Sequence, residues 1–423
     1  MTPMASRRTF LKGATLSTAL AALGDTRALF AESLSQLPWA QRPQGLPSSD
    51  DYLLAPGVRY LNHGSIGTIP RIVHEAHVRY LGLCETNPWL YMWDEPWREP
   101  REDVRGRAAR VLGCDTDEVA ITHNTTEGFN LLAQGLPLEP GDEVLFSNLN
   151  HPGASTPWLH HAPARGYTVR RFHIPLGEVP GLTESDVVEL HLREITDRTR
   201  VLVLPHLDNL VGLRHPLAAL VREAKARGVE WVAADGAQTV CMLPVDVKAA
   251  GLDFYAASPH KWVQSPKGLG LFYARRELQA HLHPMWVSSG RAAAVGTVRQ
   301  FEDYGTRNLP EVLALGDALA FQERVGPAER EAHHRQVWQR FRDAVETTPG
   351  FTWRSPTRWD VSGALYLVET DGISSGAMFQ RLYGEHGIVF RAFQTPDVDA
   401  ARISPNLQTP FEDLEAFLRY ARG

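Results

Sequence analysis

Cysteine is scarce in this chain, and the few cysteines are poorly placed for cross-linking. The 423 residues include three, Cys84, Cys114 and Cys241, an odd number that lie far apart. This excludes the disulfide framework on which small secreted domains depend. A strong charge of one sign is also lacking, with 43 basic and 49 acidic residues. Neither nucleic acid nor an anionic membrane surface is therefore an expected partner, and we expect no metal site.

The chain does have enough apolar residues for a large core. At 423 residues, with 43% hydrophobic and 22% charged, it predicts a soluble enzyme of two domains. Short apolar runs alternate with helical patterns, which indicates an α/β fold. We expect a targeting segment at 1–31, an extended arm at 32–57, a large domain at 58–305 and a small C-terminal domain at 306–423.

Two polar residues that suit one cofactor follow neighbouring apolar runs. Residues 231–234 predict a buried strand that leads into Asp235. Residues 254–257 predict the next strand, shortly before Lys261. A lysine amine can bond covalently to the aldehyde of pyridoxal 5′-phosphate (PLP). A carboxylate can keep the pyridine nitrogen of PLP protonated, so that the ring withdraws electrons. The pair therefore predicts a PLP site.

Further candidate ligands also follow expected strands. Taken singly, each has a plain structural explanation as a helix cap or a turn residue. Two threonines open a helix, where free N–H groups and hydroxyls form an anion site. Because ligands of open α/β sheets gather at the carboxyl ends of strands, we expect these side chains to meet. The candidates are Thr125, Thr126, His151, Asn209, Ser258 and His260.

One pattern resembles a known family. Asp235-Gly236-Ala237-Gln238, followed one strand later by Ser258-Pro259-His260-Lys261, is similar to the lysine region of class-V PLP-dependent aminotransferases. That family includes cysteine desulfurases and isopenicillin N epimerase-like enzymes, and residues 60–67 resemble the opening of the latter. The resemblance implies the PLP-dependent transferase fold type I. We therefore expect a large, mostly parallel sheet and a smaller α+β C-terminal domain.

The resemblance also implies roles for single residues. Lys261 would bind the cofactor and Asp235 would hold its ring nitrogen. The phosphate would be held by Thr125, Thr126, Ser258 and His260, while His151 would stack on the ring and Asn209 and Gln238 would lie near the 3′-oxygen.

Two C-terminal features resemble family elements that bear on substrate and assembly. Arg402, in the run 401–404, matches an arginine that grips the substrate α-carboxylate, a bidentate task suited to guanidinium. Arg391 is a second candidate for that carboxylate. Gly305 and Thr306 resemble a turn that reaches the phosphate of the neighbouring subunit. This implies a homodimer with shared active sites.

One departure from the family bears on the reaction. Desulfurases carry a catalytic cysteine on the loop after the equivalent of Arg391, whereas residues 392–396 contain none. A persulfide route is therefore disfavoured. The aromatic segment 87–97 fits either a substrate entrance or subunit packing, and packing is favoured.

These features predict a PLP-dependent enzyme that acts at the α-carbon of an amino acid or amino-acid-containing metabolite. Lys261 would move the α-proton. We expect an aminotransferase or an epimerase. A C–S or β-elimination lyase is the alternative, and a non-catalytic PLP-fold binding protein is a further one.

The N-terminus predicts export. Residues 6–12, Ser-Arg-Arg-Thr-Phe-Leu-Lys, resemble the twin-arginine motif. The mildly apolar stretch at 13–23 is too short for a permanent membrane anchor. We expect cleavage after Ala31 and passage of the folded, cofactor-bound protein through the twin-arginine translocase to the periplasm or medium.

Overall fold

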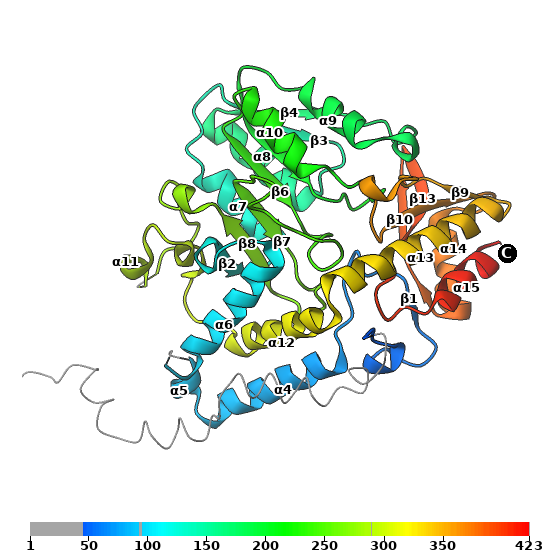
Figure 1. Cartoon of the computed structure of the whole chain (residues 1–423), viewed down its shortest axis with the longest axis horizontal. Helices are drawn as coiled ribbons and strands as arrows, with labels where there is room; N and C mark the ends of the chain where they lie inside the picture. The colour runs from blue at the N-terminus through cyan, green and yellow to red at the C-terminus, as the bar shows by residue number, and fades with distance from the viewer. Residues whose placement is uncertain (1–44, 93–94, 289, 423) are drawn as a thin grey trace, which may run out of the picture.

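A computed structural model describes residues 45–92, 95–288 and 290–422 (Figure 1). The predicted export signal at 1–31 lies outside the described residues, as does the first half of the expected arm at 32–57. Within the described ranges, no helix combines the length and apolarity needed to cross a membrane. The same residues contain no group of three or more histidine, cysteine or acidic side chains arranged to hold a metal ion.

A seven-stranded sheet forms the centre of the larger part of the molecule. Five neighbouring strands run parallel, and β8 runs antiparallel to both of its neighbours. The spatial order is β2 (Val119–Thr122), β8 (Gly270–Ala274), β7 (Phe254–Ala257), β6 (Trp231–Asp235), β5 (Thr199–Pro205), β3 (Glu143–Ser147) and β4 (Thr168–Phe172). The central strands are almost wholly apolar because both faces of the sheet are covered. The expected mostly parallel sheet is confirmed.

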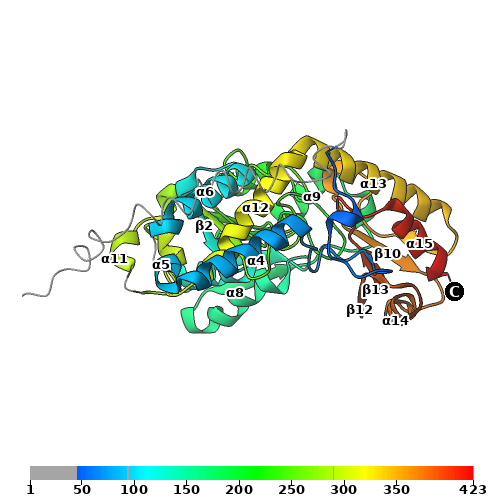
Figure 2. The same cartoon turned by 90° about the horizontal axis from the view of Figure 1, so that it is seen from below.

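Helices cover both faces of this sheet. A separate apolar core lies against each face, as alternate residues of β3 indicate. Leu145 belongs to one core, whereas Val144 and Phe146 belong to the other. Figure 2 shows α8 on one side and α6 and α12 on the other. The helices of this part are α4 (Arg71–Thr86), α5 (Pro88–Met92), α6 (Glu95–Leu112), α7 (Thr125–Gly135), α8 (Pro152–Arg165), α9 (Glu184–Leu192), α10 (Leu217–Ala226) and α11 (Arg291–Ala294).

The C-terminal part is built on a four-stranded antiparallel sheet. Its order is β12 (Arg391–Thr395), β13 (Val398–Ile403), β10 (Tyr366–Thr370) and β9 (Phe351–Trp353), with helices α12 (Leu309–Val325), α13 (Pro327–Thr347), α14 (Ser375–His386) and α15 (Phe411–Ala421). The first half of α12 packs into the core beneath the large sheet. Strand β1 (Arg59–Tyr60) pairs in parallel with β11 (Ile388–Val389), which joins the N-terminal segment to the C-terminal part.

Several short 3-10 helices complete the described part of the chain. They lie at Ser49–Asp51, Thr116–Glu118, Val179–Gly181, Arg276–Leu278, Val298–Glu302 and Trp359–Val361. Strand β2 begins at Val119, because Glu118 closes a 3-10 turn whose N-cap residue is Asp115.

Within the aromatic segment 87–97, residues 88–92 belong to α5 and residues 95–97 begin α6. Trp97 is buried, with its ring tilted against that of Tyr91 at a centroid distance of 5.2 Å. Trp89 is 64% exposed in the single chain. The segment therefore contributes both to the core and to the outer surface.

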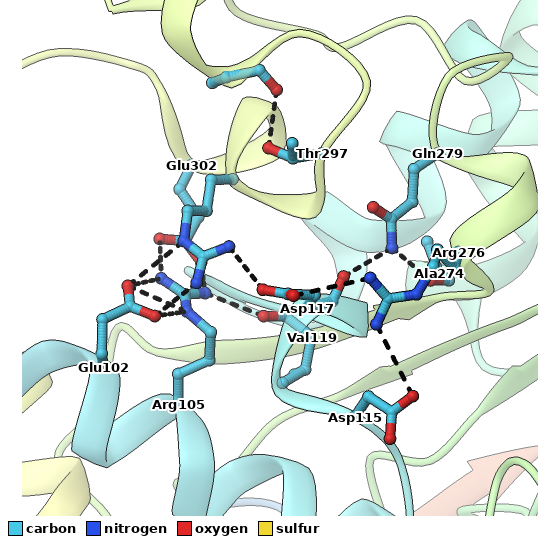
Figure 3. A network of polar contacts seen from close by, with 12 residues as sticks. Glu102, Arg105, Asp115, Asp117, Val119, Ala274, Arg276, Gln279, Thr297 and Glu302 are labelled. Atoms are coloured by element: carbon cyan, nitrogen blue, oxygen red, sulfur yellow. Dashed lines mark hydrogen bonds and ion pairs between the residues drawn. The ribbon is translucent and has the colours of Figure 1, made fainter.

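A buried arginine joins α6 to the edge of the large sheet (Figure 3). Arg105 donates to the carbonyl of Val119 at 2.9 Å and forms ion pairs with Glu102 and Glu302. Glu302 in turn accepts from the backbone N–H of Ile121 at 2.6 Å. Burial alone would raise the pKa of Glu302, but Arg105, Arg307 and the N–H of Ile121 together more than offset burial and hold that pKa below its usual value.

We expect Arg105→Leu to destabilise the fold by about 3–5 kcal/mol, because it removes the nearer cation of the partly buried Glu302 carboxylate, whose other cation, Arg307, lies 3.9 Å away. Urea denaturation measures the change. Arg110→Leu is the matched control on the same helix, since the Arg110 side chain is 62% exposed and pairs with Glu323 at the surface. It should cost about 0–1 kcal/mol. Equal effects of the two substitutions would contradict a structural role for the buried pair.

Candidate active site

The acid and the lysine singled out in the sequence lie at one edge of the large sheet. Asp235 ends β6, and Lys261 lies in the turn that follows β7, the neighbouring parallel strand. The turn after Asp235 is tied to β7, because the N–H of Gly236 donates to the carbonyl of Ala256 at 2.8 Å. One oxygen of the buried Asp235 carboxylate accepts from the N–H of Ala237 at 2.9 Å. The two strands therefore bring the acid and the amine together.

The surroundings of Lys261 favour its reactive form. Partial burial lowers the pKa of its amine to about 8, the Asp235 carboxylate opposes this effect, and the Arg402 guanidinium adds to it. An ordinary lysine amine has a pKa near 10.4. A much larger share of Lys261 is therefore neutral near pH 7, as a nucleophile or a base requires.

An oxyanion site lies at the start of α7. The hydroxyl of Ser258 accepts from the N–H of Thr125 at 3.1 Å and lies 2.8 Å from the Thr125 hydroxyl. Asn124 caps the helix by accepting from the N–H of Glu127 at 2.9 Å. Thr126 is exposed beside them. The positive end of the helix and two hydroxyls thus face one point, as a phosphate requires.

His260 lies next to this oxyanion site. Its Nδ1 is buried and has no hydrogen-bond partner among the described residues. Burial, aided by the charges of Lys261 and Lys267, lowers the pKa of His260 to about 4. The ring is therefore neutral, with one N–H to donate. A buried ring nitrogen without a partner is a group that a bound ligand would satisfy.

His151 caps α8 and belongs to the same electrostatic cluster as the acid and the lysine. Its Nδ1 accepts from the N–H of Gly153 at 3.0 Å, so the neutral ring carries its proton on Nε2. Desolvation lowers the pKa of His151, the Asp235 carboxylate opposes the shift, and Lys261 and Arg402 add to it. The structure therefore brings together four residues predicted from separate parts of the sequence.

Arg402 lies on β13 and is almost wholly buried, with 3% exposed. Its guanidinium donates to the carbonyl of Asn209 at 2.8 Å, to Asn62 at 3.1 Å and to the hydroxyl of Ser65 at 2.6 Å. Its Nε has no partner among the described residues. Burial and the like charge of Arg391 lower the pKa of Arg402 to about 10. This is a buried cation with donor capacity left for a carboxylate.

Arg391 and Asn209, two further residues predicted for the site, are both less buried than Arg402. Arg391 is exposed and lies directly across from Arg402 in the antiparallel pair of β12 and β13. Asn209 is partly buried and contacts Arg402 through its backbone carbonyl. Its turn is held by Asp208, whose carboxylate accepts three backbone N–H groups.

Gln238 is engaged within the protein at both ends of its amide. Its nitrogen donates to the carbonyl of Gly64 at 2.8 Å, and its oxygen accepts from the indole of Trp262 at 2.9 Å. It therefore ties segment 60–67 to the turn that carries Lys261. The proposed proximity of Asn209 and Gln238 to the cofactor 3′-oxygen stays a prediction.

Sequence reasoning gave segment 60–67 no role in the site, yet the structure places it there. Asn62 and Ser65 both bind Arg402, and the N–H of Gly67 donates to the carbonyl of His260 at 2.9 Å. A Cβ on Gly67 would lie 2.0 Å from the Lys261 carbonyl oxygen, so only glycine fits. The signal available in the sequence was the run of small residues with two glycines, which permits close backbone approach.

Gly305 and Thr306 lie on an exposed turn before α12. Gly305 has a φ of +100° and open space where a side chain would lie. No hydrogen bond links this turn to the residues around Lys261 within the described chain. Its predicted contact with the phosphate of a neighbouring subunit stays a prediction.

Comparison with known proteins identifies the family. The model of the family described as aminotransferase class-V matches residues 66–395. The chain belongs to the class-V aminotransferase family. Isopenicillin N epimerase from Streptomyces clavuligerus is 29% identical over 382 residues, which cover 86% of this chain and 94% of the epimerase. Cysteine desulfurase CsdA from Escherichia coli K12 is 30% identical over 349 residues, which cover 79% of this chain and 84% of CsdA.

Solved structures confirm the fold type I expected for a class-V aminotransferase. The E. coli CsdA structure in its S-sulfonic acid form matches with a TM-score of 0.74 at 27% identity, over 91% of this chain and 97% of that one. A C-DES variant with glycine covalently linked to its PLP cofactor matches with a TM-score of 0.79 at 24% identity, over 89% of this chain and 99% of that one.

The chain is therefore a PLP-dependent enzyme of the class-V aminotransferase family, and the residues around Lys261 fit the cofactor. The lysine amine has a lowered pKa, and an acid ends the adjoining strand. The hydroxyls of Thr125 and Ser258 meet at the N-terminus of α7, where a phosphate would be held. The buried Nδ1 of His260 lacks a partner that a ligand would supply.

We expect the rate at which apoenzyme captures PLP to rise with pH through about 8, because only the neutral Lys261 amine attacks the cofactor aldehyde. Absorbance stopped-flow measures the rate, and borohydride fixation with peptide mass spectrometry checks the lysine. Removing the positive charge in Arg402→Gln should raise the pKa of Lys261 and move the curve to higher pH.

Lys248→Gln is the control for this prediction, since Lys248 is an exposed lysine that pairs with Asp115. Its curve should coincide with that of the parent enzyme. A capture rate that does not change with pH, or that responds equally to both substitutions, would show that the charges around Lys261 do not set its reactivity.

Proposed function

We propose that this class-V enzyme removes and returns the α-proton of an α-amino acid or an amino-acid-containing metabolite, as an epimerase or an aminotransferase. The observation that carries the proposal is the buried guanidinium of Arg402, which keeps an unpartnered Nε in the same electrostatic cluster as Lys261 and Asp235. When bound, PLP supplies an electron sink that stabilises negative charge at the substrate α-carbon.

Four side chains would divide the work. Arg402 binds and orients the substrate carboxylate, because guanidinium offers parallel donors to its two oxygens. Lys261 moves the proton at the α-carbon, a task for which a pKa of about 8 is well matched near neutral pH. Asp235 would keep the ring nitrogen of the cofactor protonated. His151 would stack on the cofactor ring.

The arrangement of the thiols opposes a desulfurase reaction by a persulfide route. Strands β12 and β13 are joined by a tight turn at residues 396–397 that contains no cysteine. The three cysteines lie elsewhere, and burial raises the pKa of each thiol, that of Cys114 to about 12. The thiolate is the nucleophilic form of cysteine, so none of the three is prepared to accept sulfur.

The lengths of the two sequence matches favour an epimerase over a desulfurase. The S. clavuligerus epimerase aligns over 94% of its length and 86% of this chain. The CsdA alignment covers 84% of CsdA and 79% of this chain. Isopenicillin N is therefore a reasonable first compound to test beside common amino acids.

The proposal is tested by incubating the holoenzyme in D₂O with isopenicillin N and a panel of D- and L-amino acids. We expect deuterium at the α-carbon, with either inverted product or oxo acid. Arg402→Lys keeps the charge but loses the planar fork, and should weaken binding of amino acids at least about tenfold while PLP remains bound. Absorbance titration of the holoenzyme measures this binding.

Arg391→Gln is the matched control, because Arg391 faces Arg402 across the strand pair but is exposed. Loss of amino-acid binding in Arg391→Gln alone would move the carboxylate site to that residue. Ammonia and oxo acid released without an amino acceptor would indicate a lyase. Absence of any exchange or turnover across the panel would count against an enzyme acting at the α-carbon.

We further propose export through the twin-arginine route, which is supported by the match at residues 6–12. The route carries folded proteins, so the cofactor would bind before export. Replacing Arg7 and Arg8 together by lysine should hold the protein in the cytoplasm, as cell fractionation would show. Arg27→Lys, outside the motif, should leave export unchanged. Periplasmic recovery of the double variant would rule out this signal.

A further inference from the structure

A second cavity lies behind the strand that precedes Lys261. Its volume is about 460 Å³, and its walls come from the turn after β5, the start of α10 and residues 244–252. Tyr255 of β7 forms part of the wall. The residues proposed to hold the cofactor and substrate carboxylate do not line it, so it is separate from the site described above.

Two nitrogen-bearing side chains of this cavity lack partners. His215 is 1% exposed, and neither of its ring nitrogens has a hydrogen bond among the described residues. Arg214 is partly buried, and its guanidinium forms no ion pair or hydrogen bond with any residue in the described ranges. Its positive charge nevertheless affects two neighbouring side chains. It adds to the lowering of the His206 pKa and opposes the rise of the Tyr255 pKa, although burial has the larger effect on both. Buried polar groups are rarely left unsatisfied without a ligand or water.

The N-terminus of α10 faces the same cavity. The helix has ten residues and follows Pro216, which provides no side-chain cap. Leu217, Ala218 and Ala219, whose N–H groups belong to the first helical turn, all line the cavity. These orphan donors carry the positive end of the helix dipole.

The acidic residues around the cavity do not pair with Arg214 or His215. The Asp246 carboxylate is engaged by the N–H of Ala249 at 2.8 Å, and Glu184 is exposed at the start of α9. Arg222 is paired with its neighbour Glu223 at 3.1 Å. The uncommitted groups are therefore the guanidinium of Arg214, the ring of His215 and the amides of the α10 terminus.

We propose that this cavity binds a small oxyanion, the carboxylate or phosphate group of a small molecule, between Arg214, His215 and the N-terminus of α10. Arg214 supplies the charge, His215 a buried N–H, and the helix its free backbone donors. The volume admits a small metabolite rather than a chain segment.

The site adjoins the cofactor region through Tyr255. The Tyr255 hydroxyl lies 2.9 Å from Nδ1 of His206 and 2.6 Å from the hydroxyl of Thr239. A Cβ on Gly236 would lie 2.0 Å from the Tyr255 ring, so this ring directly underlies the turn after Asp235. One aromatic side chain thus separates the proposed anion from the acid of the active site.

The test is calorimetric titration of the PLP-loaded enzyme with inorganic phosphate and, separately, with acetate. We expect saturable binding of at least one anion, and the stronger of the two identifies the chemical class. Arg214→Gln should weaken it at least about tenfold, since it removes a charged donor. Arg227→Gln, at the far end of α10 where Arg227 bonds to Glu223, should bind as the parent does.

A second variant keeps the test independent of folding defects. Ala218→Glu lies at an exposed position of the first turn, where an acidic residue is favourable. Its carboxylate should occupy the cavity and abolish anion binding in a folded enzyme that still binds PLP. Binding that is lost in Arg402→Lys but retained in Arg214→Gln would belong to the substrate site and overturn the proposal. No saturable binding up to roughly ten millimolar of either anion would overturn it as well.

Discussion

The structure depends on one buried cation that joins three distant parts of the chain. Arg402 extends from the C-terminal sheet and reaches Asn62 and Ser65 near the N-terminus and the carbonyl of Asn209 after β5. A buried guanidinium is costly unless its donors are satisfied, so these segments must be in place together. Because the same group keeps a free Nε, the contacts that hold the parts of the fold together also prepare a carboxylate site.

Close backbone approach at two glycines makes this arrangement possible. Gly67 lies against the carbonyl of Lys261, and Gly236 lies against the ring of Tyr255, in both cases with no room for a side chain. The first contact brings segment 60–67 over the lysine turn. The second holds the turn after Asp235 close to β7. The site is thus formed by a rigid sheet edge and a segment laid across it, rather than by loops alone.

Much of the site was predictable because its residues follow runs whose apolar character identifies buried strands. Asp235 and Lys261 were placed correctly at neighbouring strand ends for this reason, since parallel strands end at one edge. The partners of Arg402 were not predictable, because Asn62 and Ser65 are separated from it by 340 and 337 positions. No local pattern reports contacts of that range, and the family resemblance named the arginine without naming what holds it.

Other features could not be predicted from the sequence because they depend on how distant segments pack together. No local pattern in the sequence shows that the first half of α12 enters the core of the large sheet. The unpaired state of Arg214 and His215 could not be inferred either, since a charge in a sequence is assumed to find water or an acid. Only the structure shows that both line one cavity and that, among the described residues, Arg214 has no acidic partner and His215 no hydrogen bond.

The electrostatic balance around Lys261 connects cofactor binding with substrate binding. Burial and Arg402 both lower the pKa of the amine, whereas Asp235 raises it, and the result lies at about 8. Without Asp235 the amine would lose its counter-charge, and without Arg402 it would be protonated over a wider pH range. Arg402 therefore has two effects in one position, since it presents donors to a carboxylate and also keeps the nearby amine partly neutral. Arg402, which would bind the carboxylate of the substrate, would thus also help to set the pKa of Lys261, the base that would act on that substrate.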